Sequence, residues 1–266
     1  MNYRVYILGL RENFRGRDLL KVLQDAHIPS EVFFGLNAES SISISEARNR
    51  KQEFFFYGRE LTQAEIACSF GHKAIYAKAL RDEVELAIIL EDDATIRDIP
   101  TFLNLLQDLK FSRPSLVNFG NSGYPPIHYR ARTLRSGGEF KIAKSISLPV
   151  GAYAYAVNRS ALIKIDSFFK TQNSVFFQAD YPPGLAEVLD FYFLLPSNHL
   201  VRPSGQTSLI GNRNNFSKLK PGFRSATFLF LKLTSIGWIF YARRFTNLRG
   251  ILCFFTDASL HICLLN

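Results

Sequence analysis

The chain has 266 residues, 47% of them apolar and 21% charged, and its formal net charge is +9. These values suit one sizeable folded domain with an appendage, and they exclude an intrinsically disordered chain. The three cysteines, Cys68, Cys253 and Cys263, have neither metal nor disulfide spacing, and the first residues lack the apolar region of a signal peptide. We therefore expect a cytoplasmic protein.

The excess positive charge lies in one C-terminal stretch. Between Asp190 and Asp257 the sequence has nine basic residues and no acidic one, and the remaining 23 basic residues are balanced by 23 acidic ones. A basic stretch of this kind favours binding to phosphate, either of nucleic acid or of a membrane surface.

The chain opens with a β-α-β pattern. Residues 4–8 and 31–34 are short apolar strands, and residues 15–26 carry leucines at helical spacing. The sequence Thr62-Gln-Ala-Glu65 is a capping box, in which the threonine side chain bonds the glutamate amide and the glutamate reaches back. A long helix should therefore run from here to about residue 82.

Strands and helices continue to alternate after this helix. Residues 86–90 form an apolar strand, of the kind that is covered on both faces of a sheet. The further predicted elements are a helix over 100–109 with proline at its start, a strand over 116–119, a hairpin over 130–144, a strand over 152–157, a helix over 160–170 and a strand over 191–195. This pattern predicts one mixed α/β domain over residues 1–210 and a tail over 211–266.

Three acidic residues, Glu91, Asp92 and Asp93, follow the strand over 86–90. Open α/β sheets bind ligands at their carboxyl edge, which is where this cluster should lie. Adjacent carboxylates repel one another, and a divalent cation such as Mg²⁺ or Mn²⁺ relieves the repulsion. Glu91 and Asp93 are two residues apart, a spacing that lets both face one metal or one nucleotide. The alternative is a solvated turn, and phosphatases, kinases and nucleotidyl transferases use acidic strand ends as well.

The acid cluster belongs to a series of motifs. Residues 61–72 read LTQAEIACSFGH, residues 88–93 read IILEDD, and residues 151–161 read GAYAYAVNRSA. With VYILGL over 5–10, Arg17 and the QAD over 178–180, these motifs resemble glycosyltransferase family 25, often described as lipopolysaccharide biosynthesis glycosyltransferases. The resemblance covers about residues 3–210. Its departures are Gly9 for a common asparagine, Ala64 and Ala67 for usual glycines, and Gly71 for the usual serine before His72.

The resemblance implies a GT-A-like fold, that is, a Rossmann-type nucleotide-diphospho-sugar transferase fold with a mixed, mostly parallel sheet flanked by helices. It also implies an inverting transfer of a hexose from a UDP-sugar, with Mn²⁺ or Mg²⁺ as cofactor. Asp93 is the expected metal ligand, and Glu91 the expected ribose contact or second metal ligand. Asp92 can exchange roles with Glu91. A bound cation would neutralise the charge that develops on the leaving diphosphate.

Inversion needs a base that deprotonates the acceptor hydroxyl as it attacks. Asp180 is the candidate, because it follows an apolar run and resembles the acidic position of the family. A helix cap or turn is an equally good interpretation of this residue. Glu187 and Asp190 are weaker candidates.

Further contacts to the donor are expected from two segments. Arg11, Arg15 and Arg17 follow the first strand, where one of them can meet the diphosphate; the alternative is a solvated helix start. Glu65 and His72 share a face of the helix over 62–82 with Cys68 and Tyr76. That face either contacts the substrate or is a buried structural face with a satisfied histidine and a capping glutamate.

The donor sugar is galactose by resemblance, with N-acetylglucosamine and glucose as the next candidates. The expected acceptor is a lipopolysaccharide or lipooligosaccharide core or a related glycan on a lipid-linked oligosaccharide. The alternatives are a non-catalytic protein that binds sugar nucleotides or glycans, and a nucleotidyl or phosphoryl transferase. The second of these would usually show a glycine-rich phosphate loop, which the sequence lacks.

The tail contains an apolar segment, residues 226–241, with basic residues on both sides. It is shorter than the roughly 20 residues that span a bilayer. Trp238 and Tyr241 suit a membrane interface, so we expect peripheral association with the inner face of the cytoplasmic membrane. A helix packed on the core is the alternative. The tail has no nucleic-acid-binding motif and its apolar character favours lipid, so no nucleic acid is expected as a partner.

Overall fold

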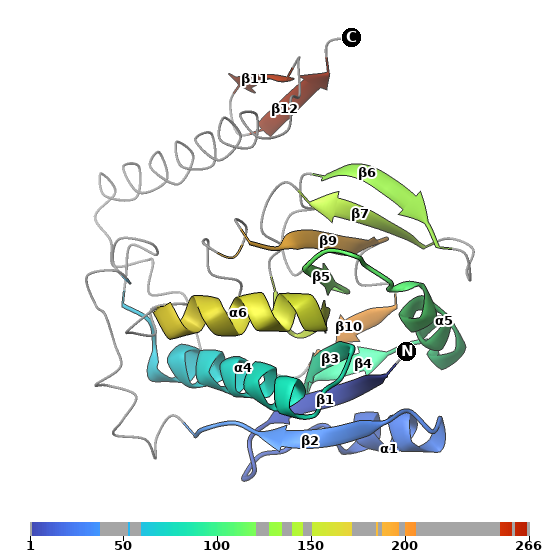
Figure 1. Cartoon of the computed structure of the whole chain (residues 1–266), viewed down its shortest axis with the longest axis vertical. Coiled ribbons are helices and arrows are strands. Elements are labelled where there is room, and N and C mark those ends of the chain that lie inside the picture. Colours follow the sequence, from blue (N-terminus) through green and yellow to red (C-terminus); the bar gives the residue numbers. More distant parts are fainter. Residues whose placement is uncertain are drawn as a thin grey trace. The chain divides into compact units, whose positions relative to one another are not determined.

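The structure is a computed structural model. It describes residues 2–37, 53, 60–120, 128–134, 140–145, 151–171, 185, 188–196 and 200–205, and the backbone of two strands, β11 (Ile251–Thr256) and β12 (Ser259–Leu264) (Figure 1). The chain divides into two compact units, Met1–Asn215 and Phe216–Asn266. In the second unit β11 and β12 pair antiparallel. The apolar segment over 226–241 lies outside the described residues.

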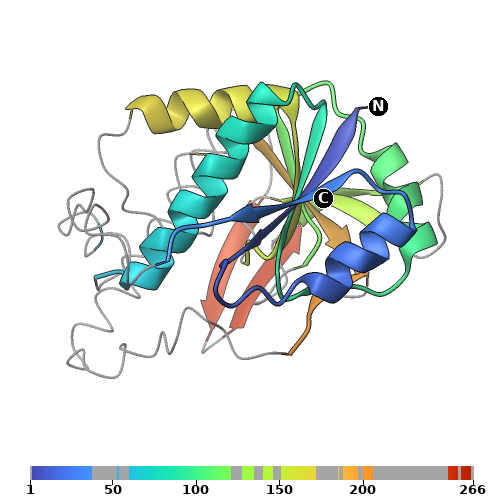
Figure 2. The same ribbon diagram turned by 90° about the horizontal axis from the view of Figure 1, so that it is seen from below.

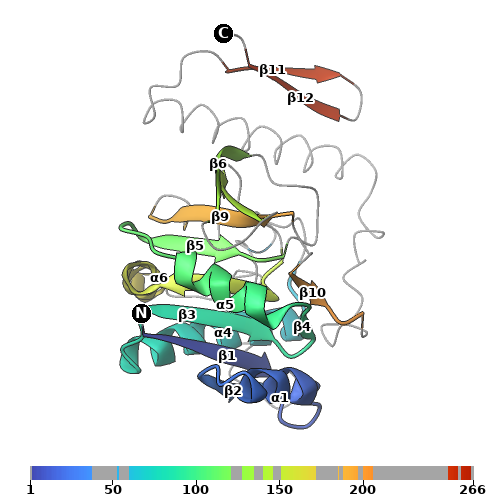
Figure 3. The same cartoon turned by 90° about the vertical axis from the view of Figure 1, so that its right-hand side faces the viewer.

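An eight-stranded sheet forms the centre of the first unit. Its spatial order is β2-β1-β3-β8-β5-β9-β7-β6, and Figure 3 shows most of these strands stacked in this order. The strands are β1 (Tyr3–Gly9), β2 (Ser30–Phe34), β3 (Leu86–Glu91), β5 (Ser115–Asn118), β6 (His128–Thr133), β7 (Lys141–Ser145), β8 (Ala154–Asn158) and β9 (Asp190–Leu195).

The sheet is mixed, as the sequence predicts, but it contains fewer parallel pairs than expected. Strands β2, β1 and β3 are parallel, and so are β5 and β9. In contrast, β8 runs antiparallel to β3 and to β5, and β7 is antiparallel to β6 and β9. A hairpin can join only antiparallel strands, whereas parallel neighbours need a longer crossover. The predicted hairpin over 130–144 is present as β6 and β7, and it accounts for part of the antiparallel share.

Helices cover both faces of the sheet. Helices α4 (Gln63–Arg81) and α6 (Arg159–Thr171) lie on one face, and α1 (Arg17–Asp25) and α5 (Ile99–Asp108) on the other (Figure 2). All four agree with the predicted helices to within about two residues, the usual uncertainty of helix ends. The α/β class predicted from the sequence is therefore confirmed.

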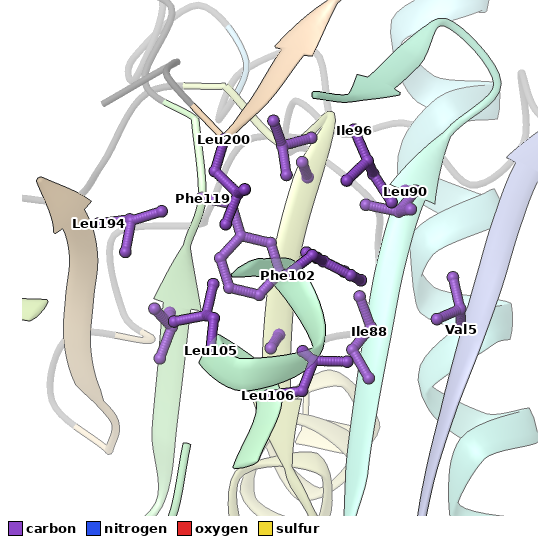
Figure 4. Close-up of a cluster of buried hydrophobic side chains, with 14 of the residues drawn as sticks. Val5, Ile88, Leu90, Ile96, Phe102, Leu105, Leu106, Phe119, Leu194 and Leu200 are labelled. Carbon is purple, nitrogen blue, oxygen red and sulfur yellow. The ribbon is translucent and has the colours of Figure 1, made fainter. Parts of the chain in front are cut away.

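The alternation of side chains along the strands supplies a core to each face. On β1, Val5 and Ile7 belong to the core beneath α1 and α5, whereas Tyr6 and Leu8 belong to the core beneath α4. Figure 4 shows the first core where α5 packs on the sheet, with Phe102 against Phe119. Successive side chains point to opposite faces of the sheet, and this alternation also determines which face the residues just after a strand point to.

Helix α4 begins at the predicted capping box. The Glu65 N–H donates to Thr62 Oγ1 at 3.1 Å, and the Thr62 N–H donates to a Glu65 carboxylate oxygen at 2.9 Å. Such a cap stabilises a helix by about 1 kcal/mol. At the other end Asp82 accepts from Tyr6 Oη at 2.8 Å, which ties the end of α4 to β1. The long helix is thus held at both ends against the sheet.

A small second sheet was not predicted from the sequence. It pairs β4 (Ala94–Ile96) with β10 (Val201–Pro203) in antiparallel register. Three-residue strands are too short to show a periodicity. The pairing fixes the segment after β3, because the Ser204 N–H donates to the backbone carbonyl of Asp93 at 2.6 Å. Among the residues that the structure describes, no helix has the length and apolar character needed to cross a membrane.

Candidate functional site

The acid cluster lies where β1, β3 and β8 meet at one edge of the sheet. The Asp92 N–H donates to the Leu8 carbonyl at 2.8 Å, and the Glu91 N–H donates to the Tyr153 carbonyl at 2.8 Å. Glu91 is the last residue of β3, and Asp92 and Asp93 form the turn into β4. The backbone of the cluster is therefore held by neighbouring strands and differs from a freely solvated turn.

Asp92 points to the face of α1, and its carboxylate binds Arg15. The Arg15 guanidinium donates to Asp92 Oδ1 at 2.8 Å, and the Arg15 backbone N–H donates to Oδ2 at 3.2 Å. Only 5% of the Asp92 side chain is exposed. Both carboxylate oxygens have a donor, so Asp92 fixes the loop before α1 and is poorly suited to hold a metal.

Gly9 makes room for this arrangement. A Cβ at Gly9 would lie 2.7 Å from Phe14 Cδ2 and 3.0 Å from Asp92 Oδ2. A larger residue here would push the loop or the carboxylate away from β1.

Asp93 is a partly buried carboxylate with one buried, unsatisfied oxygen. Only 15% of its side chain is exposed, and its Oδ1 has no hydrogen-bond partner. The Arg15 guanidinium lies 3.7 Å from Oδ2. Burial raises the pKa of Asp93 above its ordinary value, and the neighbouring Glu91 charge raises it further, while Arg15 opposes the shift. Ionisation of Asp93 is therefore less favourable in this site than for an exposed aspartate.

Glu91 points to the opposite face and meets α4. One of its carboxylate oxygens lies 3.4 Å from His72 Nε2 and 4.0 Å from Cys68 Sγ. Its side chain is 23% exposed. Because side chains alternate along β3, Glu91 follows Ile89 toward α4, whereas Asp92 turns toward α1.

His72 is buried in a chain of hydrogen bonds. Its Nδ1 lies 2.7 Å from Tyr155 Oη, and that oxygen lies 2.6 Å from Tyr76 Oη. His72 therefore fits the interpretation of this face of α4 as a buried structural face with a satisfied histidine. Its other ring nitrogen, Nε2, reaches Glu91 in the acid cluster. Glu65 lies at the start of the same helix, where its carboxylate completes the capping box. The proposed contacts of His72 and Glu65 with the donor stay predictions.

Of the three arginines after β1, the structure places Arg15 beside the acids. Arg11 is exposed, and its guanidinium carbon lies 5.0 Å from the centre of the Phe34 ring. Arg17 is exposed at the first turn of α1. Nothing in the sequence indicates which of the three loop arginines turns inward, and the contacts of Arg11 and Arg17 with the donor stay predictions.

Of the three candidate bases, the structure describes only Asp190. Asp180 and Glu187 lie outside the described residues. Asp190 begins β9, pairs in register with Ser115 at the start of β5, and binds Lys144 Nζ at 2.7 Å. These strand starts lie at the edge opposite to Glu91, so Asp190 does not lie beside the acid cluster.

Tyr153 also belongs to the site. It lies in the motif over 151–161, but the sequence assigned it no function. Its hydroxyl packs so closely on Gly120 that a Cβ there would lie 1.7 Å from it. Asp93 and burial together raise the pKa of Tyr153, with burial the larger cause, so this phenol stays protonated. The signal in the sequence was the GAYAY segment over 151–155, in which the tyrosines before and within β8 face opposite cores.

The acid cluster offers oxygen atoms of the kind that bind hard divalent cations. Asp92 and Asp93 lie beside the Arg15 guanidinium, Glu91 points toward α4, and the orphaned Oδ1 of Asp93 is an oxygen ligand of the kind that Mg²⁺ and Mn²⁺ prefer. The buried, repelling carboxylates would gain from such an ion. The assignment of Asp93 as ligand rests on this orphaned oxygen, and Glu91 is the second carboxylate whose charge reaches it.

Comparison with known proteins agrees with these observations. The model of glycosyltransferase family 25 (LPS biosynthesis protein) matches residues 2–134, which is half of the chain. Together with the α/β sheet and its acidic edge, this match defines the class of protein as a glycosyltransferase. The chain belongs to glycosyltransferase family 25.

The solved structures matched to this chain have low sequence identity and low TM-scores. One is a glycosyltransferase involved in the glycosylation of the major capsid of PBCV-1, at 10% identity and a TM-score of 0.36; the match covers 64% of this chain and 66% of that chain, slightly under two thirds of its length. Another is the protein A197 from STIV, at 12% identity and a TM-score of 0.36, with 73% of this chain and 81% of that chain covered. No curated protein sequence matches the chain.

Proposed function

We propose that this protein transfers a hexose, galactose as the best candidate, from a UDP-sugar to a lipopolysaccharide or lipooligosaccharide core glycan with inversion at the anomeric carbon. The observation that carries the proposal is the buried, unsatisfied Oδ1 of Asp93 beside Glu91, at the carboxyl edge of the sheet. The family match supports glycosyl transfer as the reaction. The donor, the acceptor and the stereochemistry are the parts that are proposed from resemblance.

Asp93, with Glu91 beside it, would hold Mn²⁺ or Mg²⁺. When bound, this cation supplies charge neutralisation for the diphosphate that leaves the sugar. The residues of the chain then have separate tasks. Asp92 fixes Arg15 through two hydrogen bonds, and the fixed guanidinium adds positive charge 3.7 Å from Asp93. His72 contacts Glu91 and orients its carboxylate toward α4.

The acceptor hydroxyl needs a base, for which Asp180 is the proposed residue. The Asp180→Asn variant should lose turnover while the affinity for the nucleotide stays near that of the wild type, because the base acts on the acceptor and not on the donor. Single-turnover kinetics and nucleotide titration on the same variant separate the two effects. Full activity of the variant would remove Asp180 from the mechanism.

A panel of nucleotide sugars, each with and without Mn²⁺, tests the proposed function. We expect UDP-galactose to bind only with the metal and to be hydrolysed or transferred slowly even without the natural acceptor. Metal-dependent binding with no turnover toward a glycan acceptor would indicate a non-catalytic sugar-nucleotide-binding protein. Turnover of a nucleotide without release of its sugar would indicate a nucleotidyl or phosphoryl transferase.

The acceptor is proposed to be a lipid-linked oligosaccharide at the inner face of the cytoplasmic membrane. The support is the basic and apolar tail, which has eight basic residues before its first acidic residue, Asp257. Partition between cytosol and membrane, compared for the full chain and a chain ending near residue 222, decides whether the tail attaches the enzyme there.

A further inference from the structure

A thiol, an imidazole nitrogen and a carboxylate oxygen converge at the start of the acid cluster. Cys68 Sγ, His72 Nε2 and a Glu91 oxygen all lie within 4.8 Å of one another. The nitrogen and the oxygen are 3.4 Å apart, and the sulfur and the oxygen 4.0 Å. From this convergence we propose that Cys68, His72 and Glu91 form a binding site for a borderline-soft divalent cation of the Zn²⁺ class, which differs from the proposed hard-cation site centred on Asp93 and shares only Glu91 with it.

The positions of the ligands follow from the local structure. Cys68 and His72 are four residues apart on α4, so their side chains lie on the same face of the helix, one turn from each other. Glu91 ends β3, and the alternation along the strand directs it to this face. The cysteines showed no metal-ligand spacing in the sequence because the third ligand lies 19 residues beyond His72 and on another element.

The distances agree with tetrahedral coordination. Zn–N and Zn–O bonds of about 2.0–2.1 Å and a Zn–S bond of about 2.3 Å place tetrahedral ligand atoms about 3.3–3.6 Å apart. The nitrogen–oxygen pair already has this separation at 3.4 Å. The thiol has to approach the oxygen by about half an ångström, and it loses its proton on binding.

The hydrogen bonds behind His72 match those expected for a metal-binding histidine. A histidine that binds a metal through one ring nitrogen commonly donates its other N–H to a fixed acceptor. Here Nδ1 lies 2.7 Å from Tyr155 Oη, and Tyr76 holds that hydroxyl from the far side at 2.6 Å. His72 is 2% exposed, so its ring orientation is set by packing as well as by Tyr155.

The chemical nature of the three ligands determines which metal ion the site prefers. A thiolate, an imidazole and one carboxylate oxygen suit Zn²⁺ or Co²⁺, whereas Mg²⁺ and Mn²⁺ favour sites made of oxygens. Three protein ligands leave a fourth coordination position for water or another small ligand. The ion would join α4 to the end of β3 and would occupy the Glu91 oxygen that faces Cys68.

Binding of Co²⁺ to the metal-free full-length protein tests the site, since Co²⁺ occupies Zn²⁺ sites and is coloured. We expect one equivalent to bind with a thiolate-to-cobalt charge-transfer band and the visible spectrum of a four-coordinate ion, and Zn²⁺ to displace it. Cys68→Ser should abolish the charge-transfer band. Tyr155→Phe should keep the band but weaken Co²⁺ binding by roughly 10- to 100-fold, because the ring then lacks its fixed partner.

Cys253→Ser is the matched control, since it removes a thiol that is not one of the three proposed ligands, and it should leave the band and the affinity unchanged. The proposal is overturned if Co²⁺ gives no charge-transfer band, or if the band survives in Cys68→Ser. In that case the His72 Nε2–H simply donates to Glu91. No nucleotide sugar is present in this experiment, so its failure leaves the proposed glycosyl transfer untouched, and the failure of the donor panel leaves this site untouched.

Discussion

Asp93→Asn should lower turnover by at least about 10³-fold and, at neutral pH, raise the stability of the metal-free protein. The loss of turnover follows from the proposed function, because charge stabilisation by a bound cation is worth several kcal/mol in the transition state. The gain in stability follows from burial. In the wild type without metal, a carboxylate with an orphaned oxygen is kept beside Glu91.

The sign of the pH dependence follows from the raised pKa of Asp93. Between the ordinary pKa of 3.8 and the raised value, the unfolded chain has released its proton and the folded protein has kept it. The wild type therefore loses stability as the pH rises through this window, and the loss persists at neutral pH. Asparagine does not titrate. The stabilising effect of Asp93→Asn should thus be present at pH 7 and vanish when the pH falls below about 3.8.

Thermal unfolding of the wild type and of Asp93→Asn over a pH series measures this difference in stability. A Mn²⁺ titration of both proteins then tests whether Asp93 binds the metal. A ligand at 100 times its dissociation constant stabilises the folded state by about 2.7 kcal/mol, so Mn²⁺ should raise the Tm of the wild type and leave that of Asp93→Asn nearly unchanged. Asp25→Asn is the control, since it removes an equal charge from an exposed position on α1. A lower Tm for Asp93→Asn at pH 7 would contradict the proposed cost of the buried charge.

The sequence predicted the elements that carry the site, because their signals are local. The capping box at Thr62 gave the start of α4, and the apolar run of β3 gave the edge at which Glu91 lies. The period of two along β3 also separates Glu91 from Asp92, which leave the strand on opposite faces. These inferences need no knowledge of distant contacts.

The partners of the acids were not predictable in the same way. Arg15 and Asp92 are 77 residues apart, and His72 and Tyr155 are 83 apart. Such pairs depend on which strands become neighbours and on their directions, and β8 entered the sheet antiparallel where a mostly parallel sheet was expected. The choice of Arg15 over Arg11 and Arg17 depended on the path of a loop whose Phe14 packs closely on Gly9.

The free energy of unfolding of the protein should depend on the ion pair between Arg15 and Asp92. Removing one partner of a buried pair leaves an uncompensated charge, which costs about 3–5 kcal/mol. Arg15→Met should destabilise the protein by about this amount, because it leaves Asp92, whose side chain is 5% exposed, next to Asp93. Asp92→Asn should cost less, since the guanidinium is 19% exposed and keeps Asp93 as a second partner.

A double-mutant cycle in urea measures this pair directly. The double variant Arg15→Met with Asp92→Asn should be more stable than the sum of the two single effects predicts, with a coupling energy of about 1–3 kcal/mol. Arg17→Met, at an exposed position on the same helix start, should change the free energy of unfolding by no more than about 0.5 kcal/mol. Equal costs for the Arg15 and Arg17 variants would mean that the pair is solvated in solution. Asp92 would then be available to the cation, and the separation of roles between Asp92 and Asp93 would be lost.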